Sequence, residues 1–170
     1  MDPERRELLE ARRREHQAGL ELRARREHVR ERLEILEAHG VPYELLFDEH
    51  PHHDWLWRRF PRTGGLTSPR VDRERVAGGS PGPETDAPDD EVRAWLAEVA
   101  ARHDLPGGDV LVLPDHGLAP AIRLPVAALL AHPAVVSSGF DAWAVCEEQG
   151  WAIEFLRFGA GWWWGRAPDS

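Results

Sequence analysis

The chain has no lysine, and its 170 residues include only one cysteine, one methionine and one tyrosine. A single cysteine excludes a framework of internal disulfides and a zinc site built from four cysteines. No apolar run approaches the roughly 18 residues that a membrane-spanning helix needs. The first residues, MDPERRELLE, also lack the apolar stretch of a secretory signal. We therefore expect a cytoplasmic protein that does not enter a membrane.

The charge of the chain is acidic and unevenly distributed. Its 21 basic side chains, all arginine, oppose 30 Asp and Glu, so the formal net charge is −9. Residues 1–40 are neutral in sum, residues 41–88 carry −2 and residues 89–170 carry −7. Binding of nucleic acid requires a basic face, so we expect no nucleic-acid partner. Arginine without lysine, beside abundant alanine, glycine and proline, indicates a GC-rich bacterial gene.

Residues 1–40 are predicted to form one long charged helix, with a proline at its start and a glycine at its end, as is typical of helix boundaries. Apolar residues at a heptad step appear only in its second half, at Leu22, Val29 and Leu36. We therefore expect residues 22–39 to pack on the body and residues 3–20 to project into solvent. Self-association through residues 3–39 is the alternative.

Two segments join this helix to the rest of the chain. Residues 41–60 begin with a predicted strand over 41–48 and continue into a polar and aromatic stretch, EHPHHDWLWRRF, which we expect to pack with the body. Residues 61–88 contain five prolines and five glycines but no aromatic residue. Such a composition favours a flexible linker or mobile loop over a packed element.

Residues 89–170 are predicted to form an acidic α+β body. Residues 89–103 place apolar side chains at helical spacing, and residues 142–166 indicate three short strands joined by glycine-containing turns. The stretches between them indicate two more strands and a short helix. The predicted fold class is α+β, an antiparallel sheet with a C-terminal three-stranded meander and two to three helices, besides the long N-terminal charged helix.

Residues 48–54 hold three histidines and three carboxylates. In an extended segment alternate side chains share a face, so His50, His52 and Asp54 can bind a divalent transition metal through nitrogen and oxygen. A further ligand must come from elsewhere, and His116 is a candidate. This set predicts a metal-binding protein or metal-dependent hydrolase. A polar surface loop, with no metal or other cofactor, is the simpler interpretation.

Five of the eight tryptophans lie in the last 28 residues. Alternation along the strands predicts that most of them fill the core, namely Trp143, Trp151 and at least one of Trp162 and Trp164. Trp163 points the opposite way and is predicted to be an exposed anchor for a protein partner, because indoles are favoured at interface hot spots. The other candidate partner-binding residues are Trp55, Trp57, Glu147 and Glu148.

No pattern of catalytic residues is specific enough to assign an activity. Cys146 lies in a strand beside two glutamates, an environment that disfavours a reactive thiolate. Glu154 projects from the middle strand of the meander, where Asp115 or His116 at a strand end could act with it. An arginine could equally pair with Glu154. We therefore assign no catalytic residue and favour a protein that is not an enzyme.

Residues 33–47, LEILEAHGVPYELLF, and the pair His50-Pro51 resemble the opening helix, glycine and Val/Ile-Pro-Tyr strand of the YbaK-type aminoacyl-tRNA editing family. The resemblance covers fewer than 20 residues, and the rest of the chain does not follow the family's pattern. The site of that family relies on a lysine, which this chain lacks. The resemblance therefore implies no editing activity here.

Together these features favour a small, acidic, non-enzymatic domain that neutralises or scaffolds a basic protein partner, as an immunity protein or antitoxin does. Acidic charge speeds association with a basic surface and makes the association sensitive to salt. The alternatives are a metal-dependent protein using residues 48–54 and a self-assembling module using residues 3–39.

Overall fold

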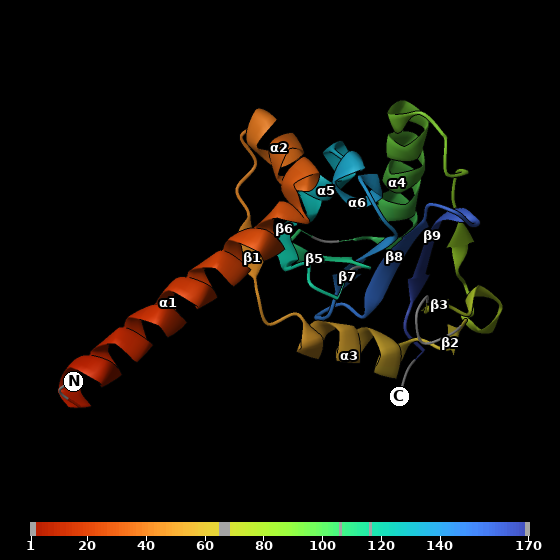
Figure 1. Ribbon diagram of the computed structural model, residues 1–170. Helices are drawn as coiled ribbons and strands as arrows, with labels where there is room; N and C mark the ends of the chain where they lie inside the picture. The colour runs from red at the N-terminus through yellow and green to blue at the C-terminus, as the bar shows by residue number, and fades with distance from the viewer. Residues whose placement is uncertain (1–2, 65–68, 106, 116, 169–170) are drawn as a thin grey trace.

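A seven-stranded antiparallel sheet forms the centre of the protein (Figure 1). The computed structural model describes residues 3–64, 69–105, 107–115 and 117–168. The sheet confirms the predicted α+β class, and its last three long strands form the predicted meander. In spatial order the strands are β1 (Glu44–Leu46), β6 (Ala121–Pro125), β5 (Asp109–Pro114), β7 (Ala142–Cys146), β8 (Trp151–Leu156), β9 (Gly161–Arg166) and β4 (Ser80–Pro81).

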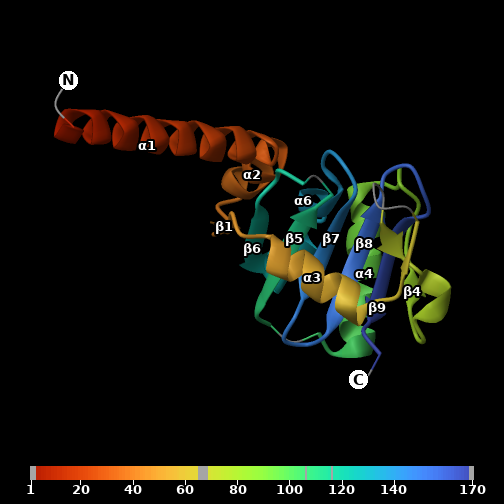
Figure 2. The ribbon, with the colours of Figure 1, turned by 60° about the horizontal axis from the view of Figure 1, so that its bottom comes forward.

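Both faces of the sheet are covered, as Figures 1 and 2 show. Alternation along β8 explains why: Trp151 and Ile153 point into one apolar core, whereas Ala152 points into another. The helix α3 (His50–Arg59) crosses the second face. Four helices cover the first face, namely α2 (Arg30–Ala38), α4 (Asp89–His103), α5 (Val126–Ala131) and α6 (Ala134–Ser137).

Tryptophan side chains fill much of the core. Four of them are fully buried, as predicted: Trp143, Trp151, Trp162 and Trp164. Trp162 packs against Phe155 with ring centroids 5.0 Å apart, and His103 stacks on Trp164 at 3.8 Å. Each buried indole removes on the order of 200 Å² from water, so Trp151, Trp162 and Trp164 hold the helices of the first face against the sheet, and Trp143 packs in the core of the second face.

The N-terminal region forms two helices, and the single helix predicted over residues 3–39 is wrong in this respect. α1 (Pro3–Glu27) ends before the buried Val29, and α2 begins directly after it. Only this second part has apolar side chains that the sheet can bury, so the chain turns there and packs Val29, Leu33 and Leu36 into the core. α1 projects away from the body (Figures 1 and 2), and we call it the arm.

Residues 69–82, which we call the strap, lie against the second face of the sheet. The sequence predicted no packed element there, but the strap contains β3 (Arg70–Val71), the one-turn helix η1 (Arg73–Arg75) and β4. β3 pairs with β2 (Arg62–Thr63), and Val71 and Val76 of the strap are buried in the second core. The apolar residues of this segment follow no period, so only contacts with distant strands reveal its packing.

Candidate interaction surface

Several connecting segments meet at one end of the sheet, which we call the loop end. Because neighbouring strands are antiparallel, the end of β5, the start of β7, the end of β8 and the start of β9 lie together. Hydrogen bonds join the segments: Asp115 N donates to Asp141 O at 2.7 Å, and Thr85 Oγ1 donates to Leu156 O at 3.0 Å. The loop end comprises residues 47–49, 83–91, 115, 117–120, 138–141 and 157–160.

Large apolar side chains are exposed at the loop end. Leu118, Phe140 and Phe158 are 57%, 61% and 90% exposed. In the described part of the chain four other large apolar side chains are exposed, and all lie on the arm: Leu8, Leu9, Leu20 and Leu22. Scattered exposed apolar residues are ordinary, but here the three outside the arm all lie at the loop end. Such a concentration is typical of a binding surface.

Phe140, Phe158 and Leu118 are not among the partner-binding residues predicted from the sequence. Alternation predicts a strand over residues 151–158, in which Phe158 would lie on one face of the sheet. β8 instead ends at Leu156, and Phe158 lies in the following turn. A phenylalanine directly before a Gly-Ala-Gly turn is the sequence signal that could have identified it, because a turn offers an aromatic side chain no sheet face to cover.

Arg157 braces the two exposed phenylalanines. Its backbone N–H donates to Asp141 Oδ1 at 2.6 Å, and its guanidinium donates to the carbonyl of Gly139. The guanidinium carbon lies 5.9 Å from the centre of the Phe158 ring. Gly139 has a φ of +78°, a left-handed conformation that favours glycine. Phe140 is therefore held on a defined loop that Arg157 connects to Phe158.

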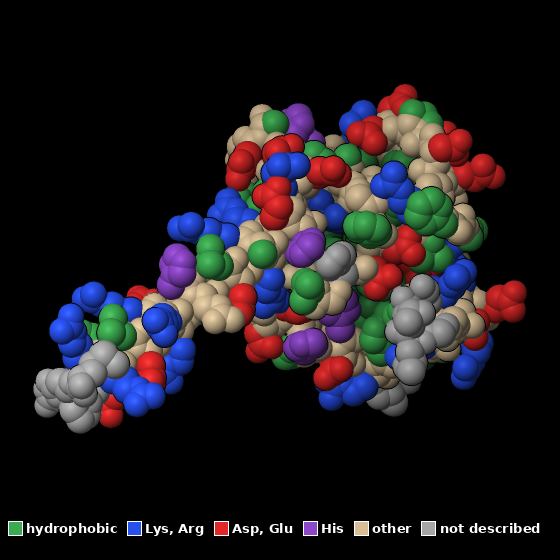
Figure 3. Space-filling model, in the orientation of Figure 1, with side chains coloured by type: hydrophobic (Ala, Val, Ile, Leu, Met, Phe, Trp, Pro, Cys, Tyr) green, Lys and Arg blue, Asp and Glu red, His purple; other side chains and the backbone are tan. Residues whose placement is uncertain are grey.

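The loop end is acidic. Burial, together with the neighbouring charge of Asp141, raises the pKa of Asp115 to about 6. Six further acidic residues of the loop end are exposed: Asp48, Glu84, Asp86, Asp89, Asp90 and Glu91. Figure 3 shows acidic side chains spread over the visible face of the body, whereas basic side chains dominate the arm. An acidic surface with exposed aromatic rings is complementary to a basic, partly apolar partner.

Arg25 ties the arm to the loop end. Its Nε donates to the carbonyl of Leu118 at 3.1 Å, and its Nη2 pairs with the buried carboxylate of Glu49. Its guanidinium carbon also lies 5.4 Å from the centre of the Phe47 ring. The arm therefore starts at the loop end, and it extends away from the sheet in both ribbon views (Figures 1 and 2).

The arm separates its charges onto two faces. Over residues 5–23, at about 100° per residue, one sector of about 120° holds Leu9 and Leu20 with Arg5, Arg6, Arg12, Arg13, Arg23 and His16 and no glutamate; Glu27, in the last turn, also falls in this sector. We call this sector the basic face. The opposite sector holds Glu7, Glu10, Glu15 and Glu21, together with Arg14. Leu9, Arg12, Arg13, His16 and Leu20 also line one surface hollow of the arm.

Trp163 is buried, so the exposed anchor predicted at this position is wrong. Its side chain is only 2% exposed. Gly79 of the strap lies over the indole, since a Cβ at this glycine would come within 2.8 Å of Trp163 Nε1. Phe60, directly after α3, meets the ring edge-on at 6.3 Å, and Arg73 lies 6.0 Å from its centre. Trp163 does point away from its neighbours, but α3 and the strap cover that face.

The other predicted partner-binding residues lie away from the loop end. Trp55 and Trp57 are half-buried on α3, where each meets another aromatic ring edge-on. Glu147 and Glu148 lie in the turn between β7 and β8, at the opposite end of the sheet. Glu147 Oε1 is 2.6 Å from His52 Nδ1 of α3, and Glu148 is exposed. These residues therefore do not form one surface with the exposed phenylalanines.

The extended geometry predicted for residues 48–54 is wrong, because α3 begins at His50. On a helix His50 and Asp54 share one side, whereas His52 points to another. Throughout the described ranges, no three His, Cys, Asp or Glu side chains are grouped closely enough to hold a metal ion. His116, the further candidate ligand, lies outside the described residues.

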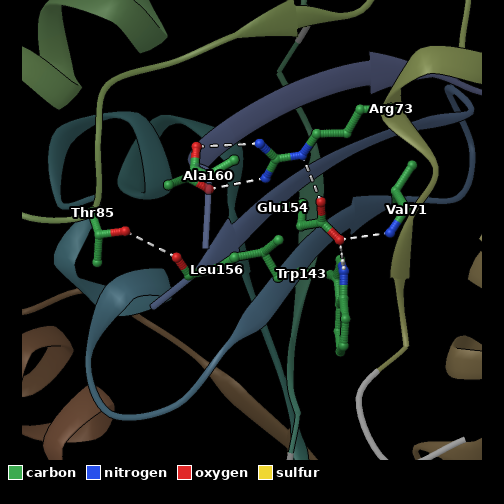
Figure 4. Close-up of polar contacts among 8 residues, drawn as sticks. Val71, Arg73, Thr85, Trp143, Glu154, Leu156 and Ala160 are labelled. Carbon is green, nitrogen blue, oxygen red and sulfur yellow. Dashed lines mark hydrogen bonds and ion pairs between the residues drawn. The ribbon is translucent and has the colours of Figure 1, made fainter. Parts of the chain in front are cut away.

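Glu154 lies fully buried beneath the strap, where three donors hold its carboxylate (Figure 4). Oε1 accepts hydrogen bonds from Val71 N at 2.7 Å and from Trp143 Nε1 at 3.0 Å. Oε2 accepts a hydrogen bond from Arg73 Nε at 2.9 Å, and the same guanidinium donates to the Gly161 carbonyl at 3.0 Å. A carboxylate held in this way anchors the strap.

Among the described residues, the remaining catalytic candidates are not assembled into a site. Cys146 is buried in β7, and burial raises the pKa of its thiol, as expected for a core residue. Asp115 follows the end of β5, and β7 separates β5 from the strand that carries Glu154. The loop end and the arm are therefore the features that bear most directly on function.

Comparison with protein-family models finds no match for this chain, and no curated protein matches it. Within the described residues, no helix combines the length and the apolar character needed to cross a membrane.

Proposed function

We propose that this protein is a bacterial, cytoplasmic, non-enzymatic protein-binding domain, and that the loop end with the base of the arm forms its binding surface. The observation that carries the proposal is that the exposed large apolar side chains of the described residues outside the arm, Leu118, Phe140 and Phe158, all lie at the loop end. Exposed apolar side chains on loops that hydrogen bonds already hold in place favour binding. A partner buries their apolar surface, and little entropy is lost in ordering the loops.

The charge of the loop end favours a basic partner. Its exposed carboxylates lie at the same end of the sheet as three exposed apolar side chains, Leu118, Phe140 and Phe158. The arrangement supports an immunity- or antitoxin-like role, in which an acidic domain covers a basic surface of the protein that it neutralises. Association of this kind is fast at low salt and weakens as salt rises.

The test is affinity capture from native lysate with the immobilised full chain, at low and at physiological salt. We compare the wild type with the double variant Phe140→Ser, Phe158→Ser, and use Arg58→Ser on α3 as the control. The proposal predicts one stoichiometric protein with a basic binding surface that the wild type and the control retain and the double variant loses. Capture of the same proteins by all three forms, or no capture at either salt, would contradict it.

A further inference from the structure

We infer that the segment which binds the loop end is the arm of a second copy of this chain, so that two copies exchange arms. The inference rests on the proposed function of the loop end as a protein-binding surface, and it names the partner. The arm presents a basic, apolar face, and the loop end presents an acidic, apolar one. One chain therefore carries both halves of a complementary pair.

The charges of the two parts have opposite sign. The arm holds eight Arg and six Glu, which gives it a net charge of +2. The whole chain carries −9, so the remainder of the chain carries −11. On the basic face, Arg12 and Arg13 flank Leu9 and Leu20, and no glutamate lies on this face between residues 5 and 23. Burial of the two leucines against phenylalanine therefore brings arginine next to carboxylate.

The dimensions of the two parts also match. The arm has 25 residues and at 1.5 Å per residue is about 37 Å long. The sheet has seven strands, and a spacing of about 4.8 Å makes the loop end about 30 Å wide. An arm laid across the loop end of another copy therefore spans it completely.

When two copies related by a two-fold axis exchange arms, the contact between an arm and a loop end forms twice. An α-helix about 37 Å long and about 10 Å wide covers a strip of roughly 370 Å². With one strip on its own arm and one on its loop end, each copy buries roughly 740 Å², close to the ~800 Å² per partner of a specific interface. The reciprocal arrangement is isologous and closed, so it stops at two copies.

Because the arm projects from the body, its helical stability favours another surface that packs against it. A charged helix without tertiary contacts is marginally stable in water, because most helical stability in proteins comes from packing of an apolar face. A lipid surface is the less favourable cover. Only Leu9 and Leu20 on the basic face can enter the bilayer boundary, and the acidic body is repelled by the anionic lipids that would attract the arginines.

The first test is the dimer dissociation constant, measured by sedimentation of the full chain. Arg13→Glu reverses a charge on the basic face, and Arg14→Glu makes the same change on the opposite face. We expect a wild-type dimer that weakens with salt, at least tenfold weaker association for Arg13→Glu, and less than threefold for Arg14→Glu. Circular dichroism checks that both variants keep the arm helical.

The second test mixes two variants that are each monomeric. One carries Leu9→Asp with Arg13→Glu on the arm, and the other carries Phe140→Ser with Phe158→Ser at the loop end. Arm exchange leaves one intact contact in the mixed pair, so a heterodimer weaker than the wild-type dimer is expected. If the wild-type dimer formed instead by pairing of the two arms with each other, the mixed pair would have no intact contact. Absence of a heterodimer would therefore overturn the inference.

Failure of the inference is distinguishable from failure of the proposed function. A wild-type chain that stays monomeric at every concentration and salt overturns arm exchange. If that monomer still captures a basic protein through Phe140 and Phe158, the proposed function stands. Sedimentation with vesicles of anionic phospholipid provides the other outcome: binding by a monomer that Arg13→Glu abolishes and Arg14→Glu does not would assign the basic face to lipid and overturn the inference.

Discussion

Arg25 and Glu49 form an ion pair where the arm meets the body, and the Glu49 side chain is almost completely buried there. The pair joins the last turn of α1 to the residue before α3. Because the same guanidinium donates to the carbonyl of Leu118, one side chain connects the arm to two segments of the loop end. The direction in which the arm leaves the body is set at this point.

We expect Arg25→Ala to lower the free energy of unfolding by about 1–3 kcal/mol, because it leaves the buried Glu49 carboxylate without its cation. Urea denaturation measures the loss, and hydrogen exchange should show faster opening of the last turn of α1. Arg30→Ala removes an exposed pair with Glu27 and is the control, with an expected loss below about 0.5 kcal/mol. Equal losses in the two variants would show that the Arg25 pair does not anchor the arm.

The strap depends on Glu154. We expect Glu154→Gln to destabilise the protein by about 1–3 kcal/mol, because a neutral amide cannot accept from Val71, Trp143 and Arg73 at once. Trypsin should then cut faster at the arginines of the strap. Glu148→Gln changes an exposed carboxylate and should stay within about 0.5 kcal/mol of the wild type. Unchanged cleavage in Glu154→Gln would refute the anchoring role.

The raised pKa of Asp115 predicts that the free energy of unfolding depends on pH. The folded protein binds the Asp115 proton up to about pH 6, whereas the unfolded chain releases it near pH 4. Stability is therefore lost as pH rises from about 4 to 6 and is flat above. Since Asp115 is partly exposed, we expect Asp115→Asn to gain only about 1 kcal/mol at pH 7.5 and nothing at pH 4. A gain of the same size at both pH values would contradict this account.

Gly165 provides room for the buried Trp163. A Cβ at Gly165 would overlap the Trp163 ring, whereas a Cβ at Gly107 would meet nothing within 4 Å. We expect Gly165→Ala to cost about 1–3 kcal/mol and to shift the tryptophan fluorescence, because the ring must move. Gly107→Ala should leave stability and fluorescence nearly unchanged. Thermal unfolding of both variants checks the difference.

The elements predicted correctly are those with a strong local period. The helical spacing from Val92 to Val99 predicts α4, and alternation predicts β7, β8 and β9 with Trp143 and Trp151 inside. These signals need only neighbouring residues in the sequence. The fold class and most of the core therefore follow from the sequence.

The errors arise where distant residues decide the outcome. Trp163 points as alternation predicts, yet it is buried because the strap, about 80 residues earlier in the chain, covers it. The helix break at Val29 depends on a sheet surface that the first 40 residues do not encode. His50 to Asp54 were interpreted as extended from their polar composition, although Leu56 and Phe60 provide the apolar spacing of a helix that packs on the sheet.

Site-specific photo-cross-linking from position 158 tests the central claim most directly. Phe158, the most exposed aromatic side chain of the loop end, is replaced by a benzophenone amino acid, and the same probe at Arg58 on α3 is the control. Our account predicts one protein adduct of defined mass from position 158, either a basic protein or a second copy of this chain, and no such adduct from position 58. No adduct from position 158, or the same adducts from both positions, would contradict the assignment of the loop end as the binding surface.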